Sequence, residues 1–286
     1  MNNQSFKQVF LIVILSVILD SPLFSQSISP ERIFHIKEST VKISIEGSNN
    51  VGTGFFINSK GHILTCWHVI APAIKIDSLT NLFIGFKKIF ITLNNNEKLE
   101  CVVPRVLVES YPDTLSYDIC VLVPAQKHAP FPFLKLGNFN NVEEGQEVIT
   151  CGYPLAIEQQ FVTKGMVSTK YIDTPILNNG IKIPRNVALL DLTLNRGNSG
   201  GAIIAIGETI NDDVVIGIAD FIIIPIAGAD ELAEELKNHS GLLIMGIDPN
   251  LMLSKIMNTL GSSFNGISGC VSINHASYLL ELAKKY

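Results

Sequence analysis

The chain has 286 residues, of which 47% are hydrophobic and 16% are charged. This composition supplies enough apolar surface for a sizeable core and excludes a globally disordered chain. The formal net charge is -5 and no dense block of Lys and Arg occurs, so we expect no nucleic-acid partner.

The first residues are typical of a secretory signal peptide. Lys7 supplies a positive charge, and an almost unbroken apolar run follows at residues 9–19. This run is too short to cross a bilayer as a helix, which needs about 20 residues. We therefore predict a signal peptide over residues 1–27, export to the periplasm or the medium, and no stable membrane span after cleavage. An uncleaved N-terminal membrane anchor is the alternative.

The body of the chain has the pattern of short strands separated by turns. Residues 40–46 alternate apolar and polar side chains, and residues 52–57 and 62–66 are predicted as a hairpin. Further strand-like segments follow at 82–86, 89–93, 99–108, 117–123, 147–152, 161–172, 187–194 and 214–224. This pattern predicts an all-β barrel or sandwich, in one globular unit over residues 28–286.

Two late segments are predicted to be helical. Residues 228–237 begin with acidic and end with basic side chains, and residues 275–285 place Tyr278, Leu279 and Leu282 on one face. Residues 225–264 are interpreted as an insertion whose helix overhangs the site described below. Its deletion should then change peptide selectivity.

The five cysteines have no C-x-x-C spacing and four lie in strand-like segments. The sequence therefore predicts no zinc site and no cysteine chemistry, although one or two disulfides are compatible with export. Among the histidines, His62 stands at the turn end of its strand and is expected at the surface.

A serine among glycines is the strongest chemical signal. Ser199 lies in the turn Gly-Asn-Ser-Gly-Gly at residues 197–201, between two β-rich runs. Such a turn can hold a hydroxyl beside free amide N–H groups, as acyl transfer requires. His68 and Asp118 stand at the ends of two other predicted strands, where they can serve as base and orienting carboxylate.

These segments resemble the chymotrypsin-like (trypsin-fold) serine peptidases, above all the bacterial HtrA/Do-like group. Residues 65–69 (TCWHV) resemble the T-x-x-H-V segment of that family, and residues 118–122 (DICVL) resemble D-I-A-V-L. Residues 191–201 (DLTLNRGNSGG) are similar to D-A-A-I-N-x-G-N-S-G-G. The resemblance covers roughly residues 40–225 and 265–285, and it implies two six-stranded β-barrels with a C-terminal helix and a catalytic cleft between the barrels.

The resemblance also implies roles for single residues. His68 would be the general base, Asp118 would orient it, and Ser199 would be the nucleophile of a serine endopeptidase. The backbone N–H groups of Gly197 and Ser199 would form the oxyanion hole. No metal or other cofactor is implied.

Substrate contacts are implied in the same way. Thr193 would lie near the bottom of the first specificity pocket, and the substrate-side strand would carry Ala219, Asp220 and Phe221. Because no aspartate stands at position 193, a preference for Lys or Arg is not implied. Protein or peptide substrates are expected. The sequence printed here leaves no room for the PDZ domain common in the HtrA group, so regulation by such a domain is not expected.

Two other functions fit parts of the sequence. Residues 197–201 also match the G-x-S-x-G elbow of α/β-hydrolase esterases, with Asp220 or Asp248 and His275 as partners. That elbow must open a helix, whereas residues 202–207 are rich in β-branched side chains. The remaining alternative is a catalytically silent, peptidase-like module that only binds peptides.

Overall fold

The computed structural model describes residues 28–77, 83–105, 117–126, 130–174, 183–223, 229–241, 248–263 and 267–283. Residues 34–286 form one compact unit and residues 1–33 another. In the described part of the smaller unit, the Arg32 N–H donates to Ser29 Oγ at 3.2 Å. This contact begins helix α2 (Pro30–Glu38). The predicted signal segment, residues 1–27, lies outside the described residues and stays a prediction.

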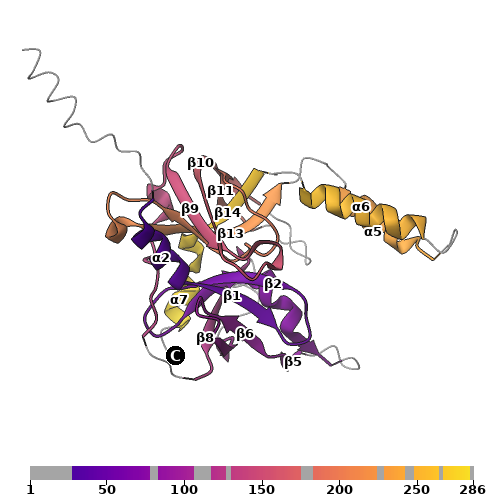
Figure 1. Ribbon diagram of the computed structural model, residues 1–286, viewed down its shortest axis with the longest axis horizontal. Coiled ribbons are helices and arrows are strands. Elements are labelled where there is room, and N and C mark those ends of the chain that lie inside the picture. Colours follow the sequence, from indigo (N-terminus) through magenta and orange to yellow (C-terminus); the bar gives the residue numbers. More distant parts are fainter. Residues whose placement is uncertain are drawn as a thin grey trace, which may run out of the picture. The chain divides into compact units, whose positions relative to one another are not determined.

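The first barrel closes in the strand order β1-β2-β3-β8-β7-β6, and its strands β1, β2, β6 and β8 lie together in the lower part of Figure 1. Its interior is apolar, with Phe55, Leu64 and Leu122 fully buried. A separate hairpin pairs β4 (Ile74–Ile76) with β5 (Phe83–Phe86). The barrel strands are β1 (Thr40–Ile45), β2 (Val51–Phe56), β3 (Ile63–Cys66), β6 (Ile89–Thr92), β7 (Lys98–Val102) and β8 (Ile119–Pro124).

The second barrel closes in the order β10-β11-β14-β13-β12-β9. Val148, Val167 and Ile203 are fully buried in its core. Its strands are β9 (Glu147–Gly152), β10 (Phe161–Asp173), β11 (Arg185–Asp191), β12 (Ala202–Ala205), β13 (Val214–Ile223) and β14 (Ile267–Ser272). Helix α7 (Ser277–Ala283) follows. The predicted all-β fold of two six-stranded barrels with a C-terminal helix is confirmed.

One connecting segment, residues 130–137, is bonded to both barrels. The Leu134 N–H donates to Phe56 O of β2 at 2.9 Å. On the other side, the Val215 N–H of β13 donates to Lys135 O at 2.8 Å, and the Gly137 N–H donates to Val215 O at 2.9 Å. These backbone bonds hold the end of one barrel to the end of the other.

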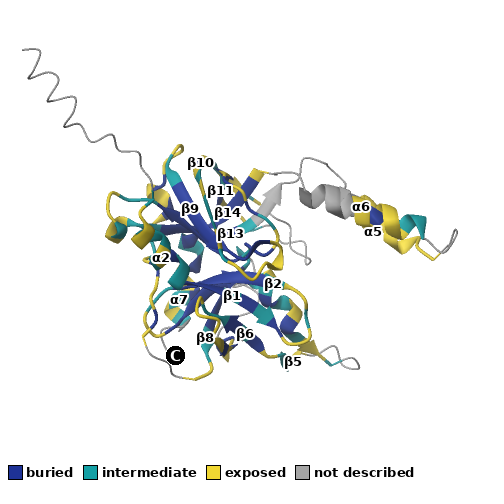
Figure 2. Ribbon diagram, viewed as in Figure 1, coloured by how far each residue is buried: buried dark blue, intermediate teal, exposed yellow. Residues whose placement is uncertain are grey.

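The late helices differ partly from the prediction. Helix α5 (Ala229–Asn238) lies where it was expected, but α6 (Pro249–Ser263) was not predicted. Three consecutive apolar residues, at 251–253, blur the helical period there. The Ser254 hydroxyl donates to Ala233 O at 2.7 Å and joins the two helices. Their described side chains are mostly exposed, in contrast to the barrel strands (Figure 2). Residues 224–228, which lead into α5, lie outside the described residues, so the overhang of this helix stays a prediction.

His62 is buried, which corrects the expectation from its place beside a turn. The residue is only 6% exposed, and its Nδ1 lies 2.6 Å from Asn58 Nδ2. The connecting segment covers this hairpin, because the Phe131 N–H donates to Ser59 O at 3.1 Å. Burial lowers the pKa of His62, so the ring is held neutral rather than solvated.

All five cysteines are buried free thiols. Burial raises the pKa of Cys101 and that of Cys151 to about 12. Thiols of this kind are poor nucleophiles near neutral pH.

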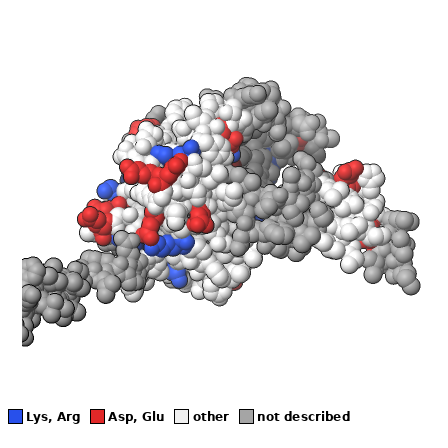
Figure 3. Space-filling model, turned by 90° about the horizontal axis from the view of Figure 1, so that it is seen from above, with Lys and Arg blue, Asp and Glu red and all other residues white. Residues whose placement is uncertain are grey.

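Charges of both signs are mixed on the surface. On the face seen in Figure 3, Lys and Arg side chains lie close to Asp and Glu side chains among many uncharged residues. Lys164 and Glu147 form an ion pair at 2.7 Å. An exposed pair of this kind contributes about 0–1 kcal/mol. Within the described residues, no helix is long and apolar enough to cross a membrane.

Candidate active site

His68 is held at the end of β3 by a carboxylate that uses both of its oxygens. The residue lies in the short helix α3 (Trp67–Ile70). Its ring Nδ1 is 2.5 Å from Asp118 Oδ2, and its backbone N–H donates to Asp118 Oδ1 at 2.8 Å. Asp118 directly precedes β8 and has a positive φ of 56°. This uncommon conformation is fixed by the two contacts and by a bond from the Trp67 N–H to Asp118 O at 3.0 Å.

The pair is electrostatically suited to proton transfer. Burial alone would lower the pKa of His68. The hydrogen bond to Asp118 and the negative charge of Asp118 outweigh that effect, so the pKa of His68 is raised. Burial would raise the pKa of Asp118, whereas hydrogen bonds from His68 and Asp220 lower it. With the Nδ1 proton directed at Asp118, ring Nε2 is left to accept a proton from another group.

Ser199 lies in a turn that two glycines make possible. Gly197 has a φ of 99°, and a Cβ there would lie 2.2 Å from Tyr153 O. Gly200 has a φ of 87°, and a Cβ there would lie 2.2 Å from Thr53 O. Both positions therefore require glycine because of conformation and space together.

The turn is also bonded to the first barrel, through Thr53 of β2. The Thr53 N–H donates to Ser199 O at 2.9 Å, and its hydroxyl donates to Gly197 O at 2.6 Å. Among the described residues, the backbone N–H groups of Gly197 and Ser199 have no hydrogen-bond partner. Two such donors beside a hydroxyl could accept a developing negative charge on an oxygen atom.

His68 and Ser199 line one open cavity of about 310 Å³. Its wall also includes Val69, Leu155 and Gly197. Within the part of the chain that the structure describes, no hydrogen bond joins Ser199 Oγ to the His68 ring. Such contacts are often long without a bound reactant and tighten only in its complex. The structure thus brings a hydroxyl, an imidazole held by a carboxylate, and free amide donors to one place.

The residues expected to contact substrate lie in different surroundings. Thr193 is exposed, and its carbonyl accepts a bond from the Thr163 hydroxyl at 3.2 Å. Ala219 is buried, and its carbonyl accepts from the Gly200 N–H at 2.8 Å and from Cys66 Sγ at 3.2 Å. The side chain of Phe221 lies outside the described set.

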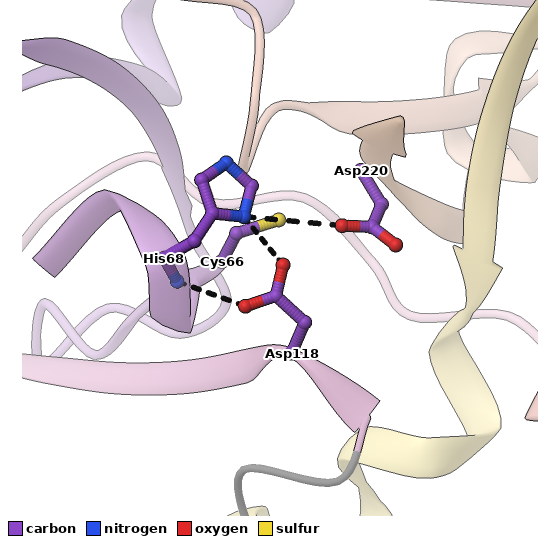
Figure 4. A group of neighbouring side chains, drawn as sticks. All are labelled: Cys66, His68, Asp118 and Asp220. Atoms are coloured by element: carbon purple, nitrogen blue, oxygen red, sulfur yellow. Dashed lines mark hydrogen bonds and ion pairs between the residues drawn. The ribbon is translucent and has the colours of Figure 1, made fainter. Parts of the chain in front are cut away.

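Asp220 makes contacts that the sequence did not predict. Its side chain is 7% exposed and lies close to His68 and Asp118 (Figure 4). Its Oδ2 is 2.7 Å from Arg185 Nη1, and Arg185 Nε is 2.9 Å from Asp173 Oδ2. The one available signal was an acidic residue in the otherwise apolar run of β13, since a buried acid needs a partner.

These side chains are also of the types that bind metal ions. Cys66, His68, Asp118 and Asp220 each place one such atom within 4.8 Å of the others. The short bond between His68 and Asp118 and the ion pair of Asp220 with Arg185 already provide partners for these groups. A hydrogen-bonded network therefore accounts for the cluster.

The family described as a trypsin-like peptidase domain matches residues 52–211. Putative protease Do-like 14 of Arabidopsis thaliana is 30% identical over 204 residues, which cover 70% of this chain and 44% of that protein. A probable periplasmic serine endoprotease DegP-like of Pseudomonas putida is 29% identical over 197 residues, which cover 66% of this chain and 35% of that protein. The chain thus spans less than half the length of these two relatives.

Solved structures show the same fold at low sequence identity. The HtrA-type protease AlgW with tripeptide has a TM-score of 0.56 and 16% identity, with 87% of this chain and 61% of that chain covered. The active form of the Rv3671c protease from M. tuberculosis has a TM-score of 0.56 and 17% identity, with 87% of this chain and 82% of that chain covered.

Proposed function

Since the chain belongs to the trypsin-like peptidase domain family, we propose that it is a serine endopeptidase that cleaves proteins through an acyl-enzyme. The observation that carries the proposal is the cavity that His68 and Ser199 share, with the His68 ring fixed on Asp118. Relatives named serine endoprotease support the same reaction class.

The arrangement of these groups supports the following reaction. Ser199 Oγ attacks the carbonyl carbon of a peptide bond while His68 Nε2 takes the hydroxyl proton. The carbonyl oxygen becomes negative and accepts hydrogen bonds from the N–H groups of Gly197 and Ser199. His68 then gives the proton to the leaving amine as the carbon–nitrogen bond breaks. Water releases the acyl group by the same steps, and Asp118 stabilises the charged ring each time.

Substrate selection is part of the proposal. The strand around Ala219 and Phe221 would lie beside the bound peptide, and Thr193 would contribute to the first specificity pocket. Threonine offers a hydroxyl and a methyl group there rather than a carboxylate. We therefore expect no preference for Lys or Arg at the cleaved bond.

Labelling with a fluorophosphonate probe tests the nucleophile directly. We expect the native protein to be labelled at Ser199 and to hydrolyse an unfolded protein, and Ser199→Ala to do neither. Ser59→Ala is the matched control, because Ser59 is exposed on a turn away from the cavity and its loss should change neither readout. Undiminished hydrolysis by Ser199→Ala would refute the assignment. A native protein that neither reacts with the probe nor cleaves, yet binds peptides, would be the silent binding module instead.

We further propose that the protein is exported. The apolar run behind Lys7 and the relatives named periplasmic endoproteases support export. N-terminal sequencing of the protein from its source cells should then find a start near residue 28. A start at the first residues, in a membrane fraction, would support the uncleaved anchor.

A further inference from the structure

Asp220 stands at an irregularity of β13 that redirects its side chain. Ala219 pairs with Cys270 of β14 and Phe221 pairs with Gly269, so Asp220 is the extra residue between two regular pairs. A bulge of this kind turns a side chain away from its regular direction and is common beside functional sites. Here it brings a carboxyl group of the second barrel next to His68 and Asp118 of the first (Figure 4).

Each oxygen of Asp220 has a different environment. Oδ2 is 2.7 Å from Arg185 Nη1, and Oδ1 is 3.9 Å from His68 Nδ1. One carboxyl oxygen of Asp220 also lies within 4.8 Å of one of Asp118, so the two carboxyl groups are close neighbours. Arg185 is itself anchored by Asp173, so the guanidinium cannot turn away from Asp220 without losing a second partner.

Two carboxylates this close repel each other, which favours a proton on one of them. Ionised carboxylates only accept hydrogen bonds, so the pair can form one only when one member is protonated. Burial, together with the hydrogen bond and the charge of Asp118, raises the pKa of Asp220 to about 7, while the pKa of Asp118 is lowered. Of the two, Asp220 is therefore the one to carry the proton, and it can donate that proton to Asp118.

Other titratable groups surround the network from every packed strand. The Arg185 charge opposes protonation of Asp220, but Arg185 is also paired with Asp173. Among the described residues, the other titratable neighbours of Asp220 or Arg185 are Cys66 on β3, Cys270 on β14, Tyr171 on β10 and His275 before α7. Burial raises the pKa of both thiols, so these cysteines stay neutral in the pH range in which Asp220 ionises.

We propose that Asp220 is a positioning residue, which holds the Asp118 carboxylate against the His68 ring by donating a shared proton to it. Arg185, which is also hydrogen-bonded to Asp173, fixes the position of Asp220. The inference rests on the proposed peptidase function, but the shared proton can be measured without it. When pH rises and Asp220 ionises, Asp118 loses a donor and gains a neighbouring like charge, so the support weakens.

Two substitutions of similar size separate positioning from packing. Asp220→Leu fills the space without a donor, whereas Asp220→Asn keeps an N–H donor and cannot ionise. We expect Asp220→Leu to lower kcat at pH 6 at least tenfold with little change in KM, and Asp220→Asn to restore most of that loss. The ratio of wild-type kcat to Asp220→Asn kcat should fall as pH rises through about 7. Glu208→Gln, the same carboxyl-to-amide change at an exposed residue, is the control and should follow the wild-type profile.

The second measurement is the carboxyl ¹³C signal of Asp220 in protein labelled at aspartate, in the Ser199→Ala background to avoid self-cleavage. We expect one signal that titrates near neutral pH and disappears in Asp220→Asn. Titration of every aspartate below about pH 5 would overturn the proposal, as would equal kcat values for the Leu and Asn variants. Absence of fluorophosphonate labelling in the native protein would instead refute the peptidase function and leave the carboxyl result intact.

Discussion

Replacing Gly200 by alanine tests the packing that fixes the Ser199 turn. The new Cβ would lie 2.2 Å from Thr53 O, 2.2 Å from Thr65 Oγ1 and 2.9 Å from Cys66 N, at a φ of 87°. The left-handed conformation costs an L-residue about 1–2 kcal/mol, and overpacking adds about 1–3 kcal/mol. We therefore expect the free energy of unfolding to fall by about 2–5 kcal/mol. Two of the three contacts are with backbone atoms, so a change of rotamer cannot relieve them.

Gly47→Ala is the matched control for this change. Gly47 has a similar φ of 71°, but a Cβ there would meet nothing within 4 Å. Only the conformational cost of about 1 kcal/mol should remain. Urea unfolding followed by the fluorescence of Trp67, the single tryptophan, gives the midpoint and slope for each variant.

One result for Gly200→Ala and Gly47→Ala would contradict the close packing of the turn. Equal losses in Gly200→Ala and Gly47→Ala, with unchanged slopes, would show that the turn does not approach Thr53 as closely as described. Fluorophosphonate labelling gives a second readout. It should fall in Gly200→Ala, because the Ser199 backbone must shift, and should remain normal in Gly47→Ala.

Three further changes test the network around His68. Asp118→Asn should lower kcat about 10⁴-fold, which corresponds to an activation free energy higher by about 5 kcal/mol. The reason is that an amide N–H facing His68 Nδ1 favours the wrong ring tautomer. A loss of less than tenfold in steady-state kinetics would contradict this. Arg185→Met should lower the free energy of unfolding by about 3 kcal/mol, since Asp173 and Asp220 both lose their guanidinium partner. Calorimetry showing no loss would argue against these contacts. Folded Asp220 keeps a proton up to about pH 7 that the unfolded chain releases near its ordinary value of 3.8. The free energy of unfolding of the wild type, relative to that of Asp220→Asn, should therefore be greatest below pH 4. It should fall as pH rises to 7, by up to about 1.4 kcal/mol per pH unit. A stability difference between the two proteins that does not change with pH would contradict the shared proton.

The sequence predicted the parts of the site that depend on local pattern. His68, Asp118 and Ser199 each occur in a short motif beside a strand end, and β3, β8 and β12 begin or end within a few residues of them. The structure brings the His68 ring onto Asp118 and into one cavity with Ser199. Their catalytic roles stay predictions until the nucleophile is labelled.

Contacts between distant strands could not be predicted in this way. Asp173, Arg185 and Asp220 stand on β10, β11 and β13, and they meet only through barrel register and the bulge at Asp220. Register depends on the hydrophobic pattern and the turns of all paired strands together, which the short motifs at single strand ends do not give. Helix α6 was missed because an apolar run blurs its period, and His62 is buried because the connecting segment at residues 130–137 covers its hairpin.

The strand order of the second barrel has a consequence for the timing of activity during synthesis. Its last strand, β14, lies between β11 and β13, and so completes the sheet that carries Arg185 and Asp220. A ribosome-bound chain already contains His68, Asp118 and Ser199 when β14 has not yet been translated. Such a chain has the reacting groups without a closed framework to align them. The proposed peptidase would therefore stay silent while it is being made and acquire activity only after residue 272 has emerged.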